Sequence, residues 1–351
     1  MIPKDEKYMA RCLHLAKLGC GSVSPNPMVG AVVVYDDRII GEGYHHRFGG
    51  HHAEPEAIAS VREKHLLPEA TLYVNLEPCS HYGKTPPCAN LIVSEKIKRV
   101  VIGCPDPNPK VSGRGVKILK DAGIEVEVGI LRKESEKLNR RFICFQEKKR
   151  PYILLKWAQT SDGFIDTIRK SHSEEALKIS NPITQQLTHK MRSENMAIMV
   201  STNTVLLDNP SLTVRYWSGK SPVRIAIDRK GIIPGNFNLK NQKERTIIFT
   251  AVASVSKPNL EYVQIPDESN DNLPFILRKL YELNIHSVLV EGGARLLTSF
   301  IRAGLWDECN IEISTATAGQ GIKAPELTDA EPESETIIDN HQWKHFCKVR
   351  S

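Results

Sequence analysis

The sequence predicts a two-domain α/β protein. The chain has 351 residues, more than a single hydrophobic core usually organises. Its composition, 40% hydrophobic and 25% charged, is typical of a globular protein and not of a disordered one. Strand-like and helix-like segments alternate through both halves, a pattern that builds sheets covered by helices.

The first half opens with an amphipathic helix over residues 5–18, where apolar side chains recur at helical spacing. A strand over residues 70–76 is ended by Pro78, because proline cannot donate to a strand ladder. The remaining elements are strands over 28–34 and 38–44, a helix opening at residue 54, a helix starting at 87–88 and continuing through 91–97, a strand over 99–103, a helix over 116–122 and a strand over 125–128.

The charged segment at residues 147–151 follows a helical stretch at 136–142 and predicts the domain boundary. We therefore expect domains at 1–147 and 148–351. The second half should form a largely parallel sheet with strands starting at 152, 197, 223, 246 and 286 and helices over 181–192 and 272–283. The acidic, proline-containing residues 324–340 predict a surface loop before a final edge strand at 344–349.

Charge and composition exclude several classes of protein. The net charge of +6 comes without any block of like charges, so it does not argue for nucleic acid, although it helps to attract a phosphorylated substrate. No stretch approaches a membrane span, and the N-terminus lacks the apolar core of a signal peptide. The eight cysteines show no disulfide framework. We expect a cytoplasmic protein with no membrane or nucleic-acid partner.

One motif predicts a catalytic zinc site. His52, Cys79 and Cys88 provide three ligands for a zinc ion with an open fourth position, and Glu54 provides a carboxylate that moves protons without binding the metal. A closed structural zinc site would need a fourth ligand, for which His51 and His81 are available. The cysteines are separated by eight residues, whereas the general zinc deaminase signature has two between them.

Four segments together resemble the deaminase half of the bifunctional riboflavin-biosynthesis deaminase–reductases, a family in which the long insertion between the cysteines is normal. The segments are residues 26–30, 52–54, 77–88 and 106–109. The resemblance implies a cytidine-deaminase-like α/β/α sandwich and a substrate with a pyrimidine ring and a phosphoribosyl group. For holding that substrate, Asn26, His81 and Lys84 are the candidates, since an amide reads a base edge and a lysine meets a phosphate.

Residues 152–163 and 201–215 resemble the reductase half of the same family, which has a dihydrofolate-reductase-like fold and uses NADPH. The resemblance implies that Arg192 and Arg215 contact the substrate, since arginine is suited to phosphate. It implies further substrate contacts at Leu212 and Glu291. It implies cofactor contacts at Ala158, Thr204, Asp208 and the glycine pair Gly292-Gly293, which lets backbone approach a pyrophosphate. Lys178 stands where the family often has a cofactor-contacting tryptophan.

We therefore expect a homo-oligomeric enzyme that uses Zn²⁺ and NADPH, deaminating a phosphoribosylamino-pyrimidine and then reducing its ribosyl group to ribityl. Two alternatives remain. In one, the chain is a single-activity nucleobase or nucleoside deaminase whose second half is a binding or dimerisation module. In the other, the zinc is a scaffold and Glu54 is dispensable.

Overall fold

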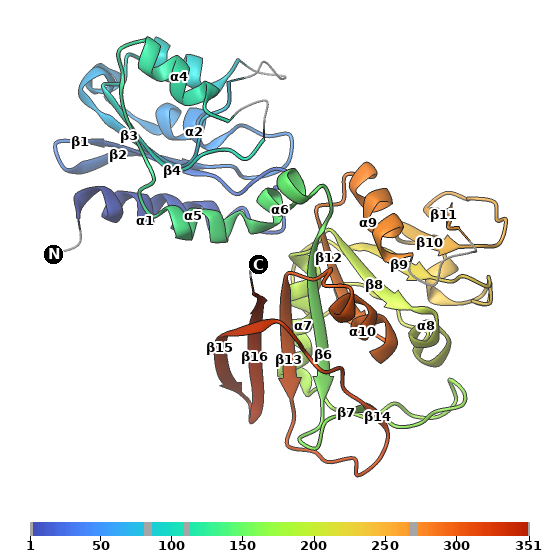
Figure 1. Cartoon of the computed structure of the whole chain (residues 1–351). Coiled ribbons are helices and arrows are strands. Elements are labelled where there is room, and N and C mark those ends of the chain that lie inside the picture. Colours follow the sequence, from blue (N-terminus) through green and yellow to red (C-terminus); the bar gives the residue numbers. More distant parts are fainter. Residues whose placement is uncertain (1–2, 81–85, 109–111, 267–271, 350–351) are drawn as a thin grey trace. The chain divides into compact units, whose positions relative to one another are not determined.

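The computed structural model describes residues 3–80, 86–108, 112–266 and 272–349. The chain divides into two compact units, Met1–Lys149 and Arg150–Ser351. Both units combine helices with a central sheet, which confirms the predicted α/β class (Figure 1).

The first unit contains a five-stranded sheet in the order β2-β1-β3-β4-β5. Strand β1 is antiparallel to both of its neighbours, and the other pairs are parallel. The strands are β1 (Gly30–Tyr35), β2 (Arg38–Tyr44), β3 (Thr71–Leu76), β4 (Arg99–Cys104) and β5 (Glu125–Val128). The helices are α1 (Lys4–Lys17), α2 (Ala53–Ser60), α3 (Cys88–Ser94), α4 (Arg114–Asp121), α5 (Arg132–Leu138) and α6 (Arg140–Lys148), with a 3₁₀ helix at Lys64–Glu69.

Helices cover both faces of this sheet. Alternate side chains of β1, such as Val32 and Val33, point to opposite faces and enter different cores. The core under Val32 includes Tyr8 and Met9 of α1, whereas the core under Val33 includes Ile58 of α2 together with apolar residues of α3 and α4. The unit is therefore the three-layer α/β/α sandwich predicted from the sequence, with α2 and α3 on one face.

The end of the first unit differs from the sequence prediction in detail. The expected helix at residues 136–142 is two helices, α5 and α6, which break at Asn139. The Asn139 side chain accepts from the Met28 N–H at 2.8 Å and donates to the Met28 carbonyl at 2.9 Å. Helix α6 continues into the first two residues of the charged segment that predicted a hinge, and it ends where Lys149 adopts a left-handed conformation.

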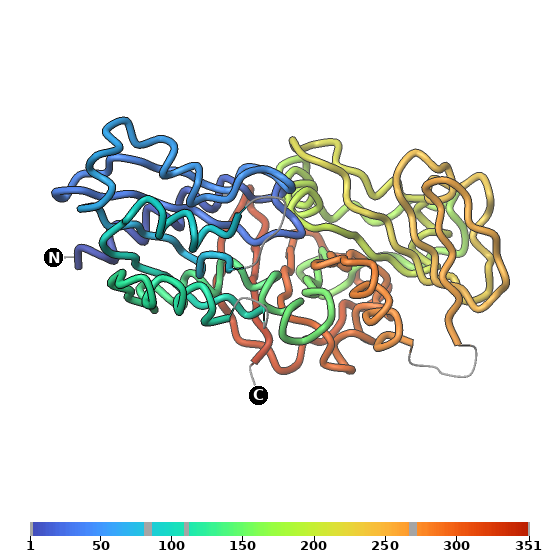
Figure 2. Tube along the Cα trace, turned by 90° about the horizontal axis from the view of Figure 1, so that it is seen from above, coloured from blue at the N-terminus to red at the C-terminus, as the bar shows by residue number. Residues whose placement is uncertain are grey.

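The second unit is built on a nine-stranded sheet in the order β11-β10-β9-β8-β12-β6-β13-β16-β15. All neighbouring pairs from β11 to β13 are parallel, and the last two pairs are antiparallel. Segments far apart in the chain, such as β6 and β13, lie side by side (Figure 2). The strands are β6 (Tyr152–Gln159), β8 (Ala197–Ser201), β9 (Val223–Ile227), β10 (Thr246–Thr250), β11 (Leu260–Gln264), β12 (Ser287–Gly292), β13 (Glu308–Ile313), β15 (Ala330–Ile338) and β16 (His341–Lys348).

Helices again cover both faces. Helices α9 (Leu273–Glu282) and α10 (Ala294–Arg302) bury their apolar sides in a core that includes Trp306. Helix α8 (Thr202–Asp208) contributes Val205 to a core on the other face. Helix α7 (Pro182–Ser193) begins with the predicted cap, because the Asn181 side chain accepts from the N–H groups of Ile183 and Thr184. A 3₁₀ helix at Asn238–Lys240 and a small sheet of β7 (Phe164–Asp166) and β14 (Ile322–Lys323) complete the unit.

The prediction of an acidic surface loop at residues 324–340 is wrong for its second part. Residues Ala330–Ile338 form strand β15, which pairs with β16 along its length and is the edge of the sheet. Asp339 and Asn340 connect the strands with φ values of 48° and 65°, the left-handed conformation of tight hairpin turns. The glutamates of β15 are explained by its edge position, where charged side chains discourage pairing with other chains.

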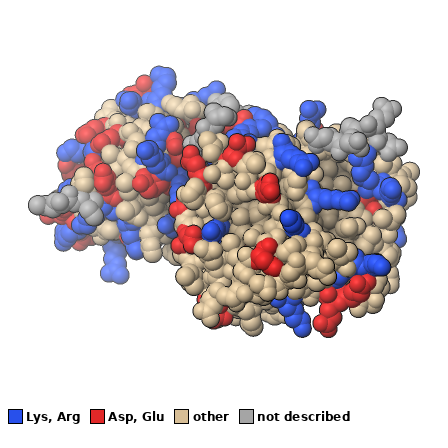
Figure 3. Space-filling model, turned by 60° about the horizontal axis from the view of Figure 1, so that its bottom comes forward, with Lys and Arg blue, Asp and Glu red and all other residues tan. Residues whose placement is uncertain are grey.

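Within the described parts of the chain, no helix is both long enough and apolar enough to cross a membrane. On the face shown in Figure 3, basic and acidic side chains are interspersed, so this face has no extended basic stripe.

Candidate active sites

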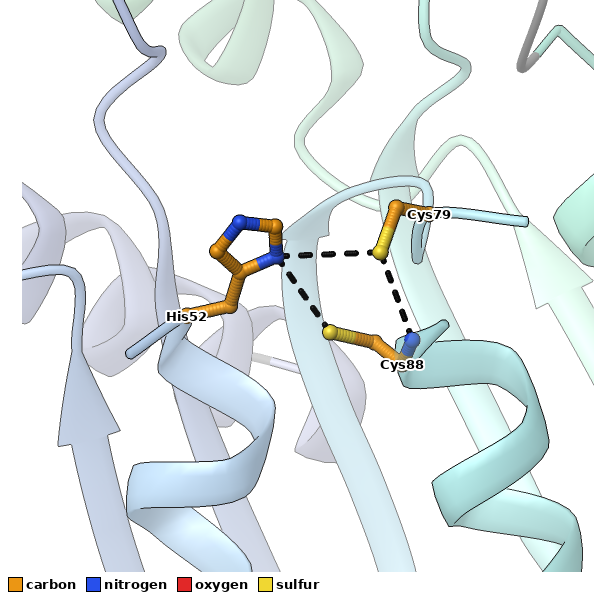
Figure 4. Close-up of side chains that lie close together, drawn as sticks. All are labelled: His52, Cys79 and Cys88. Atoms are coloured by element: carbon orange, nitrogen blue, oxygen red, sulfur yellow. Dashed lines mark hydrogen bonds between the residues drawn. The ribbon is translucent and has the colours of Figure 1, made fainter. Parts of the chain in front are cut away.

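His52, Cys79 and Cys88 converge at one end of the first sheet (Figure 4). The His52 Nδ1 atom lies 3.7 Å from Cys79 Sγ and 3.4 Å from Cys88 Sγ. Bond lengths typical of tetrahedral zinc place a nitrogen and a sulfur ligand about 3.6 Å apart. The three side chains therefore fit a zinc ion in both donor type and spacing.

Local structure explains how each ligand reaches this position. His52 is the N-cap of α2, and Cys88 is the first residue of α3, so two helix N-termini border the site. The backbone N–H of Cys88 donates to Cys79 Sγ at 3.3 Å, and the Ala89 N–H donates to the Cys79 carbonyl at 3.2 Å. The start of α3 thus holds the loop that carries Cys79, which brings the two cysteines together despite their separation in sequence.

Electrostatics also favour a dication here. Hydrogen bonding to Cys88 and His52 lowers the pKa of Cys79 to about 4, whereas hydrogen bonding to Cys79 and burial raise the pKa of Cys88. Two adjacent sulfurs resist holding two negative charges unless a cation lies between them. His51, the alternative fourth ligand, is exposed and is not part of the described cluster, and His81 lies outside the described residues.

Glu54 occupies the second position of α2 with only 3% of its surface exposed. Burial raises the pKa of its carboxyl to about 7. A carboxyl group whose pKa lies near neutrality can both accept and donate a proton, which is the property required of a general acid–base. The structure therefore places a proton-transfer group beside the three metal ligands.

Asn26 is held by a chain of hydrogen bonds through His45. His45 Nδ1 lies 2.7 Å from the His51 carbonyl oxygen, which can only accept, so Nδ1 carries the proton. His45 Nε2 then accepts from the Asn26 amide nitrogen at 3.1 Å, and this orientation leaves the Asn26 carbonyl oxygen available to a ligand. The other two predicted substrate contacts, His81 and Lys84, lie outside the described residues.

Glu77 is a further residue of this site, to which the sequence pattern gave no role. It lies two positions before Cys79 in the chain. This buried carboxylate accepts four backbone N–H bonds, from Asp106, Gly113, Gly115 and Val116. Three of these donors lie at the N-terminus of α4, where a negative charge is favourable. Glu77 thereby fastens the end of β3, and with it the Cys79 loop, to α4.

The second unit contains a cavity of about 1650 Å³ at the carboxyl ends of its parallel strands. Ligands of open α/β sheets bind at this end. All but one of the residues predicted for the second half line the cavity: Ala158, Lys178, Arg192, Thr204, Asp208, Arg215, Glu291, Gly292 and Gly293.

Leu212 is the exception. Its side chain is 3% exposed and packs in the core beside α8, so it cannot present its side chain to a ligand. Its backbone has a φ of 54°, a conformation that is uncommon for residues other than glycine and that is often found at functional sites. A ligand contact at Leu212 would therefore have to use the backbone.

The glycine pair provides a close approach to backbone beside the N-terminus of α10. Gly293 has a φ of 75°, and a Cβ atom added there would lie 2.3 Å from Ser201 Oγ. The first residues of α10 line the cavity, so their N–H groups are available to an anion. These observations fit the pyrophosphate of a dinucleotide such as NADPH.

Paired charges also line the cavity. Arg192 donates to both carboxylate oxygens of Glu291, at 2.8 Å and 2.6 Å. Burial acts to raise the pKa of Glu291, but the Arg192 guanidinium outweighs it and the pKa lies below its ordinary value. Asp208 is bound by Arg169, with an Arg169 Nη2 to Asp208 Oδ1 distance of 2.6 Å. Three of the predicted contact residues, Arg192, Glu291 and Asp208, are thus ordered by protein partners.

Lys156 is a cavity residue that the sequence analysis missed. It is 7% exposed, and its Nζ lies 3.5 Å from Glu312, which is completely buried and also bonds Ser180 and His341. A lysine in the first strand of the second half was a detectable signal, because a cation is unusual in a buried strand.

The two halves match two family models. Residues 2–104 match the cytidine and deoxycytidylate deaminase zinc-binding region, and residues 151–349 match the RibD C-terminal domain. The chain is 42% identical to the riboflavin biosynthesis protein RibD of Aquifex aeolicus, covering 92% of this chain and 90% of that protein. It is 37% identical to RibD of Escherichia coli K12, covering 99% and 96%.

Solved structures agree over the whole length. The chain resembles the diaminohydroxyphosphoribosylaminopyrimidine deaminase/5-amino-6-(5-phosphoribosylamino)uracil reductase of Thermotoga maritima with a TM-score of 0.88 and 40% identity, covering 99% of each chain. Its TM-score against RibD of Acinetobacter baumannii is 0.87, with 32% identity.

A zinc deaminase domain followed by an NADPH-dependent reductase domain defines a bifunctional enzyme, both a hydrolase and an oxidoreductase. The chain belongs to the RibD family of riboflavin biosynthesis enzymes. This membership excludes the alternative of a single-activity deaminase with a binding module.

We expect about one zinc ion per chain, because the three ligands form one catalytic-type site. Metal analysis of the purified protein measures this. The Cys79→Ser, Cys88→Ser double variant should lose the zinc, and a Cys20→Ser variant, which changes an exposed cysteine outside the cluster, should keep it. Zinc retained by the double variant would refute the ligand assignment.

Gly293→Ala should raise the KM for NADPH by roughly tenfold, because a left-handed alanine costs about 1–2 kcal/mol and its Cβ meets Ser201. Steady-state reductase kinetics test this expectation. Gly235→Ala is the matched control, since a Cβ there meets nothing within 4 Å. An unchanged KM in Gly293→Ala would contradict a cofactor role for the glycine pair.

Proposed function

We propose that this chain deaminates 2,5-diamino-6-(5-phosphoribosylamino)pyrimidin-4(3H)-one and then reduces the ribosyl group of the product to ribityl. The observation that carries the proposal is the coexistence of the Glu54 zinc cluster with a large cavity bearing Arg192, Arg215 and the glycine pair. The Thermotoga maritima relative is named for the same two activities. We assign deamination to residues 1–147 and reduction to residues 148–351, in a cytoplasmic homo-oligomer.

In the deaminase site, bound zinc supplies a Lewis acid that activates water for attack on the ring carbon. The Glu54 carboxylate takes one proton from the water and delivers it to the ring nitrogen, and it then takes the remaining hydroxyl proton and delivers it to the amine as the carbon–nitrogen bond breaks and ammonia leaves. The Asn26 carbonyl oxygen, oriented by His45, accepts from an N–H on the base edge. We also assign substrate contacts to His81 and Lys84, with the lysine meeting the phosphate.

In the reductase cavity, NADPH supplies a hydride to the sugar carbon. Gly292, Gly293 and the N-terminus of α10 would hold the pyrophosphate of the cofactor, and Ala158, Lys178, Thr204 and Asp208 would complete the cofactor contacts. Lys156 is positioned to supply the proton that the sugar oxygen requires, since it is a buried ammonium held by Glu312.

The substrate binds in the same cavity, at the charged residues Arg192, Arg215 and Glu291. Arg215 anchors its phosphate, because an exposed guanidinium at the cavity wall can donate two hydrogen bonds to phosphate oxygens. Arg192 uses three N–H groups on Glu291 and the Thr213 carbonyl, which leaves fewer donors for the substrate. The backbone of Leu212 completes the substrate site.

The reaction order is tested by giving the purified enzyme the diaminopyrimidine with and without NADPH. Without NADPH, ammonia and the deaminated ribosyl compound should accumulate. With NADPH, the ribityl compound should form and NADPH should be consumed. Reduction of the diaminopyrimidine before any ammonia release would contradict the proposed order, and the absence of both products would contradict the proposed substrate.

A further inference from the structure

His189 is a buried side chain at the reductase cavity that the proposed function leaves without a role. It lies in α7, is 4% exposed and is part of the cavity lining. Arg192, one turn further along the helix, has Nη1 at 3.4 Å from His189 Nε2. Arg215, the proposed phosphate anchor, belongs to the loop that passes over the ring.

The contacts of His189 define its protonation state. Its Nδ1 atom lies 2.8 Å from the backbone nitrogen of Arg215 and 3.4 Å from that of Tyr216. Backbone N–H groups can only donate, so Nδ1 is an acceptor and a neutral ring carries its proton on Nε2. The 3.4 Å approach of Arg192 Nη1 to Nε2 is then a contact between two donors and not a hydrogen bond. Burial and the nearby charges of Arg192 and Arg215 lower the pKa of His189 to about 4, which keeps the acceptor available at neutral pH.

The loop that carries Arg215 is attached to α7 on both sides of Val214. The Thr213 carbonyl accepts from Arg192 at 3.2 Å, and the N–H groups of Arg215 and Tyr216 lie on His189 Nδ1, whereas the Val214 N–H donates to Ser221 Oγ at 3.2 Å within the loop. The ring of Tyr216 lies 4.7 Å from the His189 ring, and the Arg215 guanidinium lies 5.7 Å from the Tyr216 ring. Arg215 and Tyr216 are themselves exposed, so burial of their side chains does not hold this loop in place.

We propose that His189 is a positioning residue of the phosphate site: its Nδ1 fixes the backbone at Arg215 so that the guanidinium is held at the cavity wall before the substrate arrives. The inference rests on the proposed function, in which Arg215 binds the phosphate. The physical reason is preorganisation. A long, exposed side chain on an unattached loop must lose backbone and rotamer freedom when it binds, and that cost lowers affinity.

Two substitutions distinguish the effect of the Nδ1 hydrogen-bond acceptor from the effect of ring packing. His189→Phe keeps an aromatic ring against Tyr216 and removes Nδ1, and we expect it to raise the KM for the phosphorylated substrate by roughly three- to tenfold, the loss of one buried hydrogen bond. The kcat and the KM for NADPH should change little. His189→Asn places an amide oxygen near the position of Nδ1, so it should restore the KM to within about twofold of the wild-type value.

The decisive measurement combines His189→Phe with Arg215→Ala. If His189 acts through Arg215, adding His189→Phe to the Arg215→Ala enzyme should raise the KM no further. Inhibition by ribose 5-phosphate gives an independent readout: its inhibition constant should rise in His189→Phe and recover in His189→Asn, while that of NADP⁺ stays constant. His172→Asn is the matched control, because His172 is exposed and is not among the cavity-lining residues.

Fully additive effects of the two substitutions, or a His189→Asn variant as impaired as His189→Phe, would overturn the inference while leaving Arg215 as the phosphate anchor. An Arg215→Ala enzyme with normal kinetics would instead remove the proposed function of Arg215. A parallel loss of kcat and NADPH affinity in His189→Phe would show general damage to the cavity and would equally overturn the positioning role.

Discussion

Glu54→Gln is expected to lower the rate of deamination by about 10²–10⁴-fold, the usual contribution of general acid–base catalysis. The substitution preserves the size of a side chain that is 3% exposed and removes its ability to carry a proton between water and substrate. Zinc content should be unchanged, because Glu54 is not a member of the ligand cluster. Ammonia release and metal analysis on the same preparation measure both quantities.

Glu56→Gln provides the matched control. Glu56 lies in the same first turn of α2, so both substitutions remove one negative charge from the helix N-terminus. For Glu56→Gln this removal costs roughly 0.3–1 kcal/mol of stability. The charge of Glu54 does not stabilise the fold in the same way, because burial raises the pKa of its carboxyl. Only Glu54→Gln should lose deamination. Near-normal turnover in Glu54→Gln would leave the mechanism without its proton carrier and would favour a scaffold role for the metal.

Arg215→Ala should lower the reductase kcat/KM roughly ten- to more than a hundredfold, which corresponds to a loss of about 1.5–3 kcal/mol of transition-state stabilisation. The loss follows from removing a charge-assisted, bidentate contact to the phosphate, whose binding energy orients the sugar for hydride transfer. Deamination should be unaffected, because all three metal ligands and Glu54 belong to the other unit. Steady-state kinetics of the two half-reactions on one preparation test the expectation.

Arg278→Ala is the corresponding control, since Arg278 is an exposed arginine of α9 and does not line the cavity. It should retain both activities. Simultaneous loss of both half-reactions in Arg215→Ala would indicate a folding defect or a shared site. Retention of both would mean that Arg215 is only a surface charge.

The zinc site shows how far local sequence carries a functional prediction. The order of a histidine, a glutamate and two cysteines limits the chemistry because few sites need these side chains together. The spacing of the cysteines alone did not establish that they meet. Their meeting depends on hydrogen bonds from the first turn of α3 to Cys79, and the turn that carries Cys79 depends in addition on the four bonds that Glu77 accepts.

The reductase half divides differently. The resemblance implied ten contact residues, and nine of them line a single cavity in the structure. The resemblance could not tell which of these side chains face a ligand and which bind other protein groups. The sequence predicts that Arg192 binds the phosphate, yet its guanidinium donates hydrogen bonds to Glu291, a residue 99 positions away in the chain. Leu212 resembles a contact residue, yet its side chain belongs to a core.

By itself the sequence determined the two-unit α/β organisation, most helices and strands, and the choice of His52, Cys79, Cys88 and Glu54 as one candidate site, whose side chains lie together in the structure. These properties follow from hydrophobic periodicity and from residue types whose chemistry has few alternatives. Tertiary structure alone decided that residues Ala330–Ile338 pair as an edge strand, that Lys156 lies buried against Glu312 and that His189 accepts from the Arg215 backbone. Each of these three features depends on residues from distant segments of the chain. Long-range contacts of this kind produce no periodic pattern in the local sequence, so they cannot be predicted from it.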